Sequence, residues 1–203
     1  TALTAMQTLP QLQAHVGAAL NIGASPLQLR ETIYQCAPYI GFPKTLNAID
    51  IANGVFEANG ISLPLENAGT VDATDPSARE QAGAAIQAPL YGNEVKEVFS
   101  ALPKPFDEFV PHLLTSSAFG DFATRGGLDV AQRELISLVA IAAIGATTQL
   151  RPHVAGAIRA GSSRQKVAAA LVHVMPYIGG PYALSGLVLV ARYDESASAE
   201  VYR

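Results

Sequence analysis

Apolar residues recur at intervals of three and four along most of the chain, which is the spacing of one helix face. Near the N-terminus Leu12, Val16, Ala19 and Leu20 follow this spacing, and Pro10 suits the first turn of a helix. No segment alternates convincingly between apolar and polar residues, as a half-buried strand would. The sequence therefore predicts an all-α protein.

Caps and turn residues divide this pattern into separate helices. Ser25 before Pro26 and Asp129 before an apolar run are N-cap signals, and Gly23 is placed to end the first helix. Residues 119–129, FGDFATRGGLD, are rich in turn formers and predict a connector. The helices expected after the first are one following Pro26, one from Pro43 to about Ala58, short ones at about 77–88, 93–102 and 106–117, and four at about 130–144, 147–160, 164–178 and 181–193.

Two parts of the chain repeat the same sequence at an offset of 138 residues. Between 11–46 and 149–184, 13 of 36 aligned positions are identical without a gap. The aligned segments include QLQAHVGAA with QLRPHVAGA, and PYIGFP with PYIGGP. In the second pair, proline interrupts helical hydrogen bonding and glycine permits a turn between helices. A period this long indicates a duplicated domain, because the repeats of a solenoid are much shorter.

The repeat divides the chain into three parts. Residues 1–58 are the first copy, 59–105 are a linker with short helices, and 106–203 are the second copy. At the common offset Thr1 corresponds to Val139, so the first copy is incomplete at its N-terminal end. Two explanations stay open: the first copy has lost the preceding turn, or further residues precede Thr1.

These motifs resemble the carboxymuconolactone decarboxylase family, whose superfamily also includes alkylhydroperoxidase D. The second copy is the more similar, with Glu134 and His153 at the separation expected of the family's active-site residues. The peroxidase branch has two cysteines between them, and Ala146 and Gln149 occupy those positions here. The resemblance implies an all-helical protein that acts on a small molecule without a cofactor. It also implies a homo-oligomer, either a trimer or a dimer of tandem subunits.

Glu134 and His153 are the candidate catalytic residues. On one straight helix they would lie about 100° apart, so a break at the GATT segment, 145–148, is needed to bring them together. A carboxylate beside an imidazole orients the ring and raises its basicity, which suits proton transfer near neutral pH. The resemblance implies that His153 is the acid/base in a decarboxylation and that Glu134 orients it. The alternative is a structural pair.

Four further residues are candidates for binding a substrate. Arg133 and Arg151 lie close to the catalytic pair in sequence and could hold a carboxylate. Tyr177 belongs to the PYIGGP motif and has a hydroxyl that could face a pocket. His15 is the first copy's equivalent of the second-copy histidine, but its copy has no matching glutamate. Its alternatives are a structural role or a site completed by another subunit.

Cys36 is the one cysteine of the chain and the only candidate for thiol chemistry. It lies on an apolar helix stripe, where a buried and unreactive thiol is expected. A peroxidatic cysteine requires a lowered pKa and exposure. Peroxiredoxin-type activity through Cys36 is therefore an alternative function, and a non-catalytic scaffold that binds a small molecule is another.

The composition excludes several other classes of function. A net charge of −4 and a pI near 5.5 give no basic face for nucleic acid. The longest apolar run, 135–146, is shorter than the ~20 residues that a membrane helix needs. The four histidines form no close pair, so no metal site is expected. With no recognisable secretory signal and a single cysteine, the sequence predicts a cytoplasmic protein.

Overall fold

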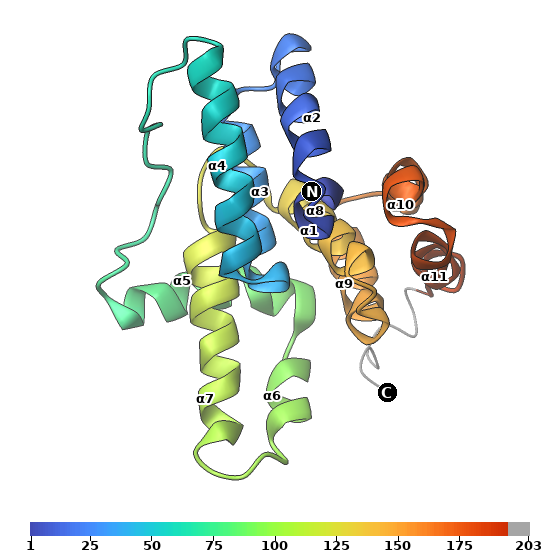
Figure 1. The fold of residues 1–203 in the computed structure, drawn as a ribbon. Coiled ribbons are helices and arrows are strands. Elements are labelled where there is room, and N and C mark those ends of the chain that lie inside the picture. Colours follow the sequence, from blue (N-terminus) through green and yellow to red (C-terminus); the bar gives the residue numbers. More distant parts are fainter. Residues whose placement is uncertain (195–203) are drawn as a thin grey trace.

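The computed structural model describes residues 1–194, and every regular element within that range is a helix (Figure 1). The predicted all-α class is therefore confirmed. None of these helices is long and apolar enough to cross a bilayer. The residues of the predicted second copy beyond 194 lie outside the described part. The elements are α1 (Ala2–Met6), α2 (Leu9–Asn21), α3 (Pro26–Ile40), α4 (Phe42–Ala58), α5 (Pro76–Tyr91), α6 (Glu94–Phe99), α7 (Phe106–Leu113), the π-helix η1 (Leu114–Ala123), α8 (Val130–Ala143), α9 (Thr147–Arg159), α10 (Arg164–Ile178) and α11 (Gly180–Ala191).

The sequence repeat is also a repeat of helices. Helices α9 and α10 begin and end 138 residues after α2 and α3, and α11 begins 138 residues after α4. Gly41 and Gly179 make the same turn in the two copies, each with φ of 87°. Glycine adopts this left-handed region without steric penalty. Pro38 and Pro176 lie inside α3 and α10, so the glycines end these helices and the prolines do not.

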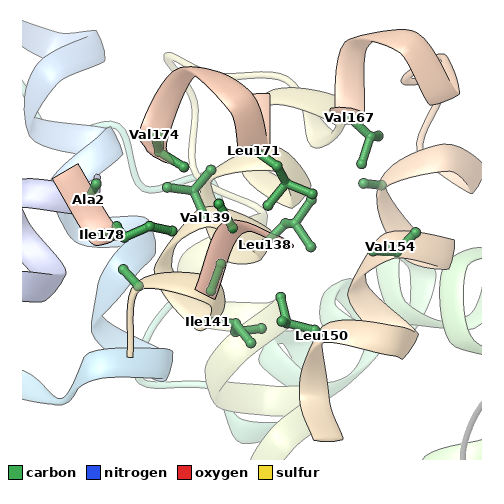
Figure 2. Packing of buried hydrophobic residues seen from close by; sticks show 14 of the residues in the cluster. Ala2, Leu138, Val139, Ile141, Leu150, Val154, Val167, Leu171, Val174 and Ile178 are labelled. Carbon is green, nitrogen blue, oxygen red and sulfur yellow. The ribbon is translucent and has the colours of Figure 1, made fainter. Parts of the chain in front are cut away.

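The first helix of the chain packs into the hydrophobic core of the second copy. Ala2 and Ala5 of α1 lie in the same cluster as Leu138 and Ile141 of α8 and Leu171 of α10, all of them buried (Figure 2). The first copy is therefore anchored on the second through α1, a helix that the sequence pattern did not predict.

A smaller cluster stabilises the first copy itself. Leu12 and Val16 of α2, Ile33 of α3, and Ala48 and Phe56 of α4 are all buried in it. The apolar stripe that predicted α2 from the sequence is the face that enters this cluster.

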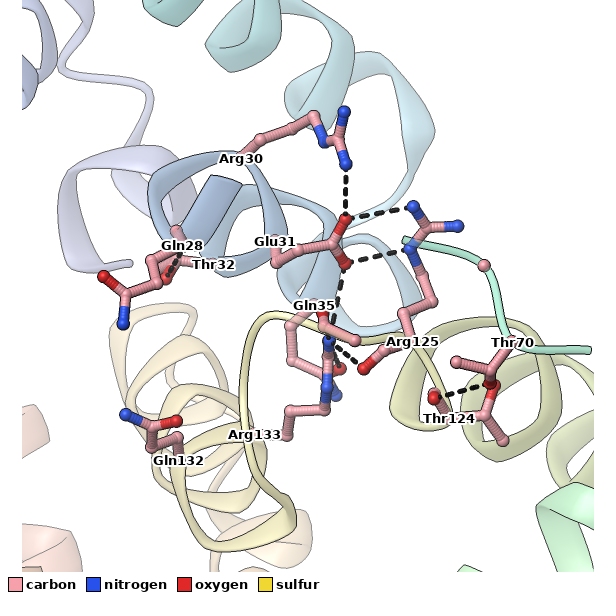
Figure 3. A network of polar contacts seen from close by, with 12 residues as sticks. Gln28, Arg30, Glu31, Thr32, Gln35, Thr70, Thr124, Arg125, Gln132 and Arg133 are labelled. Atoms are coloured by element: carbon pink, nitrogen blue, oxygen red, sulfur yellow. Dashed lines mark hydrogen bonds and ion pairs between the residues drawn. The ribbon is translucent and has the colours of Figure 1, made fainter. Parts of the chain in front are cut away.

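A buried polar network joins α3 to α8 (Figure 3). Glu31 is fully buried and accepts hydrogen bonds from Arg125 at 2.9 and 3.0 Å, from Arg30 at 3.1 Å and from Arg133 at 3.4 Å. Arg133 also donates to Gln35 at 3.1 Å. Burial acts to raise the pKa of Glu31, but the hydrogen bonds and charges of the arginines outweigh it and hold that pKa below its ordinary value. The network therefore depends on an ionised Glu31.

Helix α5 packs directly on η1, and this contact differs from the sequence prediction. Residues 119–129 were predicted to be a connector, but η1 continues to Ala123. Gly83 of α5 and Gly120 of η1 allow the contact, since a Cβ on either would lie within 2.3 Å of a backbone oxygen of the other helix. Packing against α5 thus outweighs the turn preference of Gly120. The contact positions the end of α5 beside α8 and α9.

Candidate active site

Glu134 and His153 come together because the chain breaks between α8 and α9. Gly145 has φ of 72° and follows the end of α8, and α9 begins two residues later. This break lies at the predicted GATT segment. Glu134 Oε2 lies 3.5 Å from Nδ1 of His153, with side chains 3% and 12% exposed. The predicted proximity of the two residues is confirmed, and the imidazole keeps some access to solvent.

Tyr91, the last residue of α5, bridges the pair. Its hydroxyl donates to Oε2 of Glu134 at 2.5 Å and lies 2.9 Å from Nδ1 of His153. A phenol has one proton, so once Tyr91 donates to Glu134 its oxygen accepts from Nδ1–H of His153. The other ring nitrogen, Nε2, is then the one left to exchange a proton with a substrate. We call this arrangement the Glu134–Tyr91–His153 relay.

Neighbouring residues on η1 and α9 hold Tyr91 in place. Its ring packs edge-on against Phe119 of η1, with centroids 5.7 Å apart. The preceding carbonyl, that of Leu90, accepts a hydrogen bond of 2.6 Å from Nη1 of Arg159 on α9. Gly156 of α9 leaves room for the phenol, because a Cβ there would lie 2.3 Å from the Tyr91 hydroxyl. The side chain is buried and fixed by α9 and η1 together.

Gly156→Ala is expected to displace Tyr91 and break the relay. The added methyl would also lie 2.9 Å from Oε2 of Glu134, so both partners would have to move. We expect at least about a tenfold loss of catalytic turnover at this site. We also expect overpacking to lower the free energy of unfolding by about 1–3 kcal/mol. Gly54→Ala is the matched control, since Gly54 lies in α4 and nothing is within 4 Å of a Cβ there. If Gly156→Ala keeps the activity of Gly54→Ala, close packing at Tyr91 is unimportant.

The tyrosine of each PYIG motif contacts the histidine of the other copy. The ring of Tyr39, from the first copy, contacts His153 edge-on at 5.3 Å, and the ring of Tyr177, from the second copy, contacts His15 at 5.5 Å. The structure therefore brings Tyr39 to the candidate catalytic histidine, whereas the sequence pointed to Tyr177. The reason is that α3 of the first copy packs on α8 of the second.

The surroundings of His15 differ from those of His153. His15 lines a pocket of about 370 Å³ with His173 and Tyr177, and the lining contains no carboxylate. Among residues 1–194, the first-copy histidine therefore has the aromatic neighbour of its second-copy equivalent but no carboxylate in the lining of its pocket.

Neither candidate arginine belongs to the relay, and the two lie in different surroundings. Arg133 is 1% exposed and donates to Gln35, to Glu31 and to two backbone carbonyls. These contacts give it a structural role in joining α3 to α8. Arg151 is exposed on α9, and two residues along a helix correspond to about 200° of rotation. Its side chain therefore leaves α9 on a different side from His153.

Cys36 is unsuited to redox chemistry. It is fully buried, and its thiol donates to the carbonyl of Thr32 at 3.2 Å. Burial raises the pKa of the thiol to about 11, so the reactive thiolate is scarce at neutral pH. This is the opposite of the environment that a peroxidatic cysteine requires.

We expect Cys36 to react with a thiol reagent only after unfolding. A disulfide-exchange reagent such as 5,5′-dithiobis(2-nitrobenzoate) should label the native protein far more slowly than the protein in guanidinium chloride. Labelling or peroxide oxidation of the native thiol within seconds would show that it is accessible and would reopen the redox alternative.

Among residues 1–194, no group of three or more histidine, cysteine, aspartate or glutamate side chains is arranged to hold a metal ion.

Fold and site together define an all-helical tandem repeat with a histidine at its candidate acid/base centre. The model of the carboxymuconolactone decarboxylase family matches residues 1–54 and 110–192, which are more than half of the chain. The chain belongs to this family. It is also 28% identical over 110 residues to nitrosuccinic acid decarboxylase of Metarhizium robertsii, an alignment that covers 54% of this chain and 77% of that protein.

Tyr91 is the site residue that sequence reasoning missed. It lies in the predicted linker, outside both segments matched by the family and outside both aligned segments of the repeat. The only sequence signal at Tyr91 is the glycine that follows it, Gly92, which marks the end of a helix. No sequence signal connects it with Glu134, which follows 43 residues later.

Proposed function

We propose that this protein is a decarboxylase that acts by acid/base chemistry on a small carboxylated or lactone metabolite. The observation that carries the proposal is the Glu134–Tyr91–His153 relay, in which one imidazole is oriented through Nδ1. Membership of the carboxymuconolactone decarboxylase family and the similarity to nitrosuccinic acid decarboxylase support the reaction class.

The proposed reaction has two steps. The bond between the substrate carboxylate and its carbon breaks, carbon dioxide leaves, and the electron pair stays on that carbon. An adjacent electron-withdrawing group, such as a conjugated lactone or a nitro group, delocalises the pair. Protonated His153 then gives a proton from Nε2 to the carbon, and solvent restores the proton to the imidazole. Through Tyr91, the Glu134 carboxylate stabilises the imidazolium before this transfer.

Carbon dioxide release from a panel of substrates tests the proposal. Carboxymuconolactone and nitrosuccinate are the first two substrates, and peroxide consumption with a thiol reductant is measured on the same preparation. We expect carbon dioxide from at least one acid and no peroxide turnover. Peroxide turnover without carbon dioxide would favour the redox alternative. Saturable binding of these acids without turnover would favour the non-catalytic scaffold.

Tyr91→Phe is expected to lower kcat while leaving the fold intact. Phenylalanine keeps the packing against Phe119 but removes the hydroxyl that fixes Nδ1 of His153. We expect a loss of about 10- to 100-fold, the range that partners of metal-bound histidines show when removed. Tyr177→Phe is the matched control, because it removes the hydroxyl of the tyrosine whose ring contacts His15 instead. Equal activities for the two variants would argue against the relay.

Self-association remains a prediction. Large apolar side chains are exposed on α10 and α11, among them Val172, Leu184 and Val188. These side chains support a homo-oligomer, because buried interface cores are apolar.

A further inference from the structure

A pocket of about 580 Å³ lies between α3, α4, η1 and residues 67–73 of the loop after α4. Its apolar lining includes Tyr34 of α3, Phe42 and Leu46 of α4, and Phe122 of η1. Phe42 and Phe122 contact each other, with ring centroids 6.3 Å apart. Neither Tyr91, Glu134 nor His153 lines it, so the pocket is separate from the candidate active site.

Two arginines also line this pocket, and their electrostatic settings differ. Arg79 binds Asp121 through two hydrogen bonds, at 2.6 and 2.5 Å, so this pair adds no net charge. Arg125 binds Glu31 through Nε and Nη2, which leaves Nη1 outside the pair. The guanidinium of Arg125 also stacks over the ring of Tyr34, 5.1 Å from its centroid. Arg125 therefore connects the pocket to the buried network around Glu31.

That network contains more positive than negative charge. Arg30, Arg125 and Arg133 all bind the single carboxylate of Glu31, which gives three positive charges against one negative charge. Arg30 also donates to the carbonyl of Glu66 at 2.7 Å, but a carbonyl carries no charge. Buried charges are costly unless they are paired. An anion beside Arg125 would balance part of this excess.

We propose that the pocket binds a small organic anion, with its carboxylate at Nη1 of Arg125 and an apolar or aromatic body against Tyr34, Phe42 and Phe122. Arginine suits this role because its planar guanidinium can bond two carboxylates through different edges. The Arg125 side chain is 18% exposed, so a ligand in the pocket can reach it. The pocket volume is also in the range of small-molecule sites.

Titration of the full chain with benzoate and with its neutral analogue benzyl alcohol tests this proposal. Calorimetry should show saturable binding of benzoate, and benzyl alcohol should bind at least about tenfold more weakly. Methyl NMR shifts should move at Ile49, which lines this pocket, and stay fixed at Ile136, which lines the pocket beside His15. No saturable binding, equal binding of the two probes, or shifts centred on Ile136 would overturn the proposal.

A pair of charge-adding variants tests the electrostatic argument. Leu46 is 57% exposed at the pocket, so Leu46→Glu adds a negative charge there with little risk to folding. We expect benzoate to bind about tenfold more weakly, because like charges repel across the partly wet pocket. Ile22→Glu adds the same charge after the end of α2, where Ile22 is 87% exposed and does not line the pocket, and should leave the affinity unchanged. Equal affinities for both variants would contradict an anion site in this pocket.

Discussion

Replacing His153 with glutamine is expected to lower kcat for decarboxylation by about 10²- to 10⁴-fold, while the protein still folds. This is the range that a positioned proton donor contributes to a reaction. Glutamine can keep a hydrogen bond to the Tyr91 hydroxyl, but it cannot deliver a proton from the position of Nε2. Steady-state measurement of carbon dioxide release gives kcat, and circular dichroism checks the helical fold.

His15→Gln is the matched control for this prediction. His15 is the repeat equivalent of His153, is exposed, and has a tyrosine neighbour of the same kind. We expect this variant to keep nearly full activity, because no carboxylate of the described part of the chain lines the pocket beside it. If His15→Gln loses the activity and His153→Gln keeps it, the reaction takes place in the first copy and the proposed site is wrong.

Glu31→Gln is expected to lower the free energy of unfolding by about 3–5 kcal/mol. Removing one partner of a buried ion pair has costs of this size, because the remaining charge is left without compensation. Here three arginines would lose their common carboxylate, and Arg133 is fully buried. Such a loss is a large part of the ~5–15 kcal/mol stability of a typical domain. Chemical denaturation of the two proteins measures it.

Glu108→Gln is the control for this loss of charge, and the pH dependence gives a second test. Glu108 pairs with Lys104 on the surface, so its replacement should leave the stability nearly unchanged. The pKa of Glu31 lies below its ordinary value in the folded protein, so its contribution is fully present above the unfolded pKa. That contribution is lost as the pH falls through the folded pKa. The free energy of unfolding of Glu31→Gln should therefore fall less steeply as the pH is lowered than that of the unchanged protein. An equally steep fall in the two proteins would contradict this role of Glu31.

Local signals were sufficient to predict most of the helices of the two copies. Ser25 and Asp129 each form the predicted N-cap, with Gln28 and Gln132 completing capping boxes. The repeat offset predicted which helices correspond, and the Gly145 break predicted that Glu134 and His153 would approach each other. These features depend on residues close in sequence or on the duplication itself.

The remaining features depend on contacts between distant parts of the chain. Tyr91 reaches the site because α5, which lies in the predicted linker, packs on η1 of the second copy through paired glycines. Arg133 and Arg151 were equal candidates for substrate binding by sequence. The structure distinguishes them, because Arg133 is buried against Glu31 and Arg151 is exposed. Tyr39 contacts His153 and Tyr177 contacts His15 because of how the two copies pack, and sequence periodicity does not specify that packing.

The most direct test of the central claim is mass spectrometry of the product formed in D₂O during a single turnover. With the unchanged protein we predict one carbon dioxide per product molecule and one deuterium on the carbon that lost its carboxylate. With His153→Gln we predict the same product at a rate about 10²- to 10⁴-fold lower. Formation of the same product at an unchanged rate by His153→Gln would contradict the assignment of His153 as the proton donor.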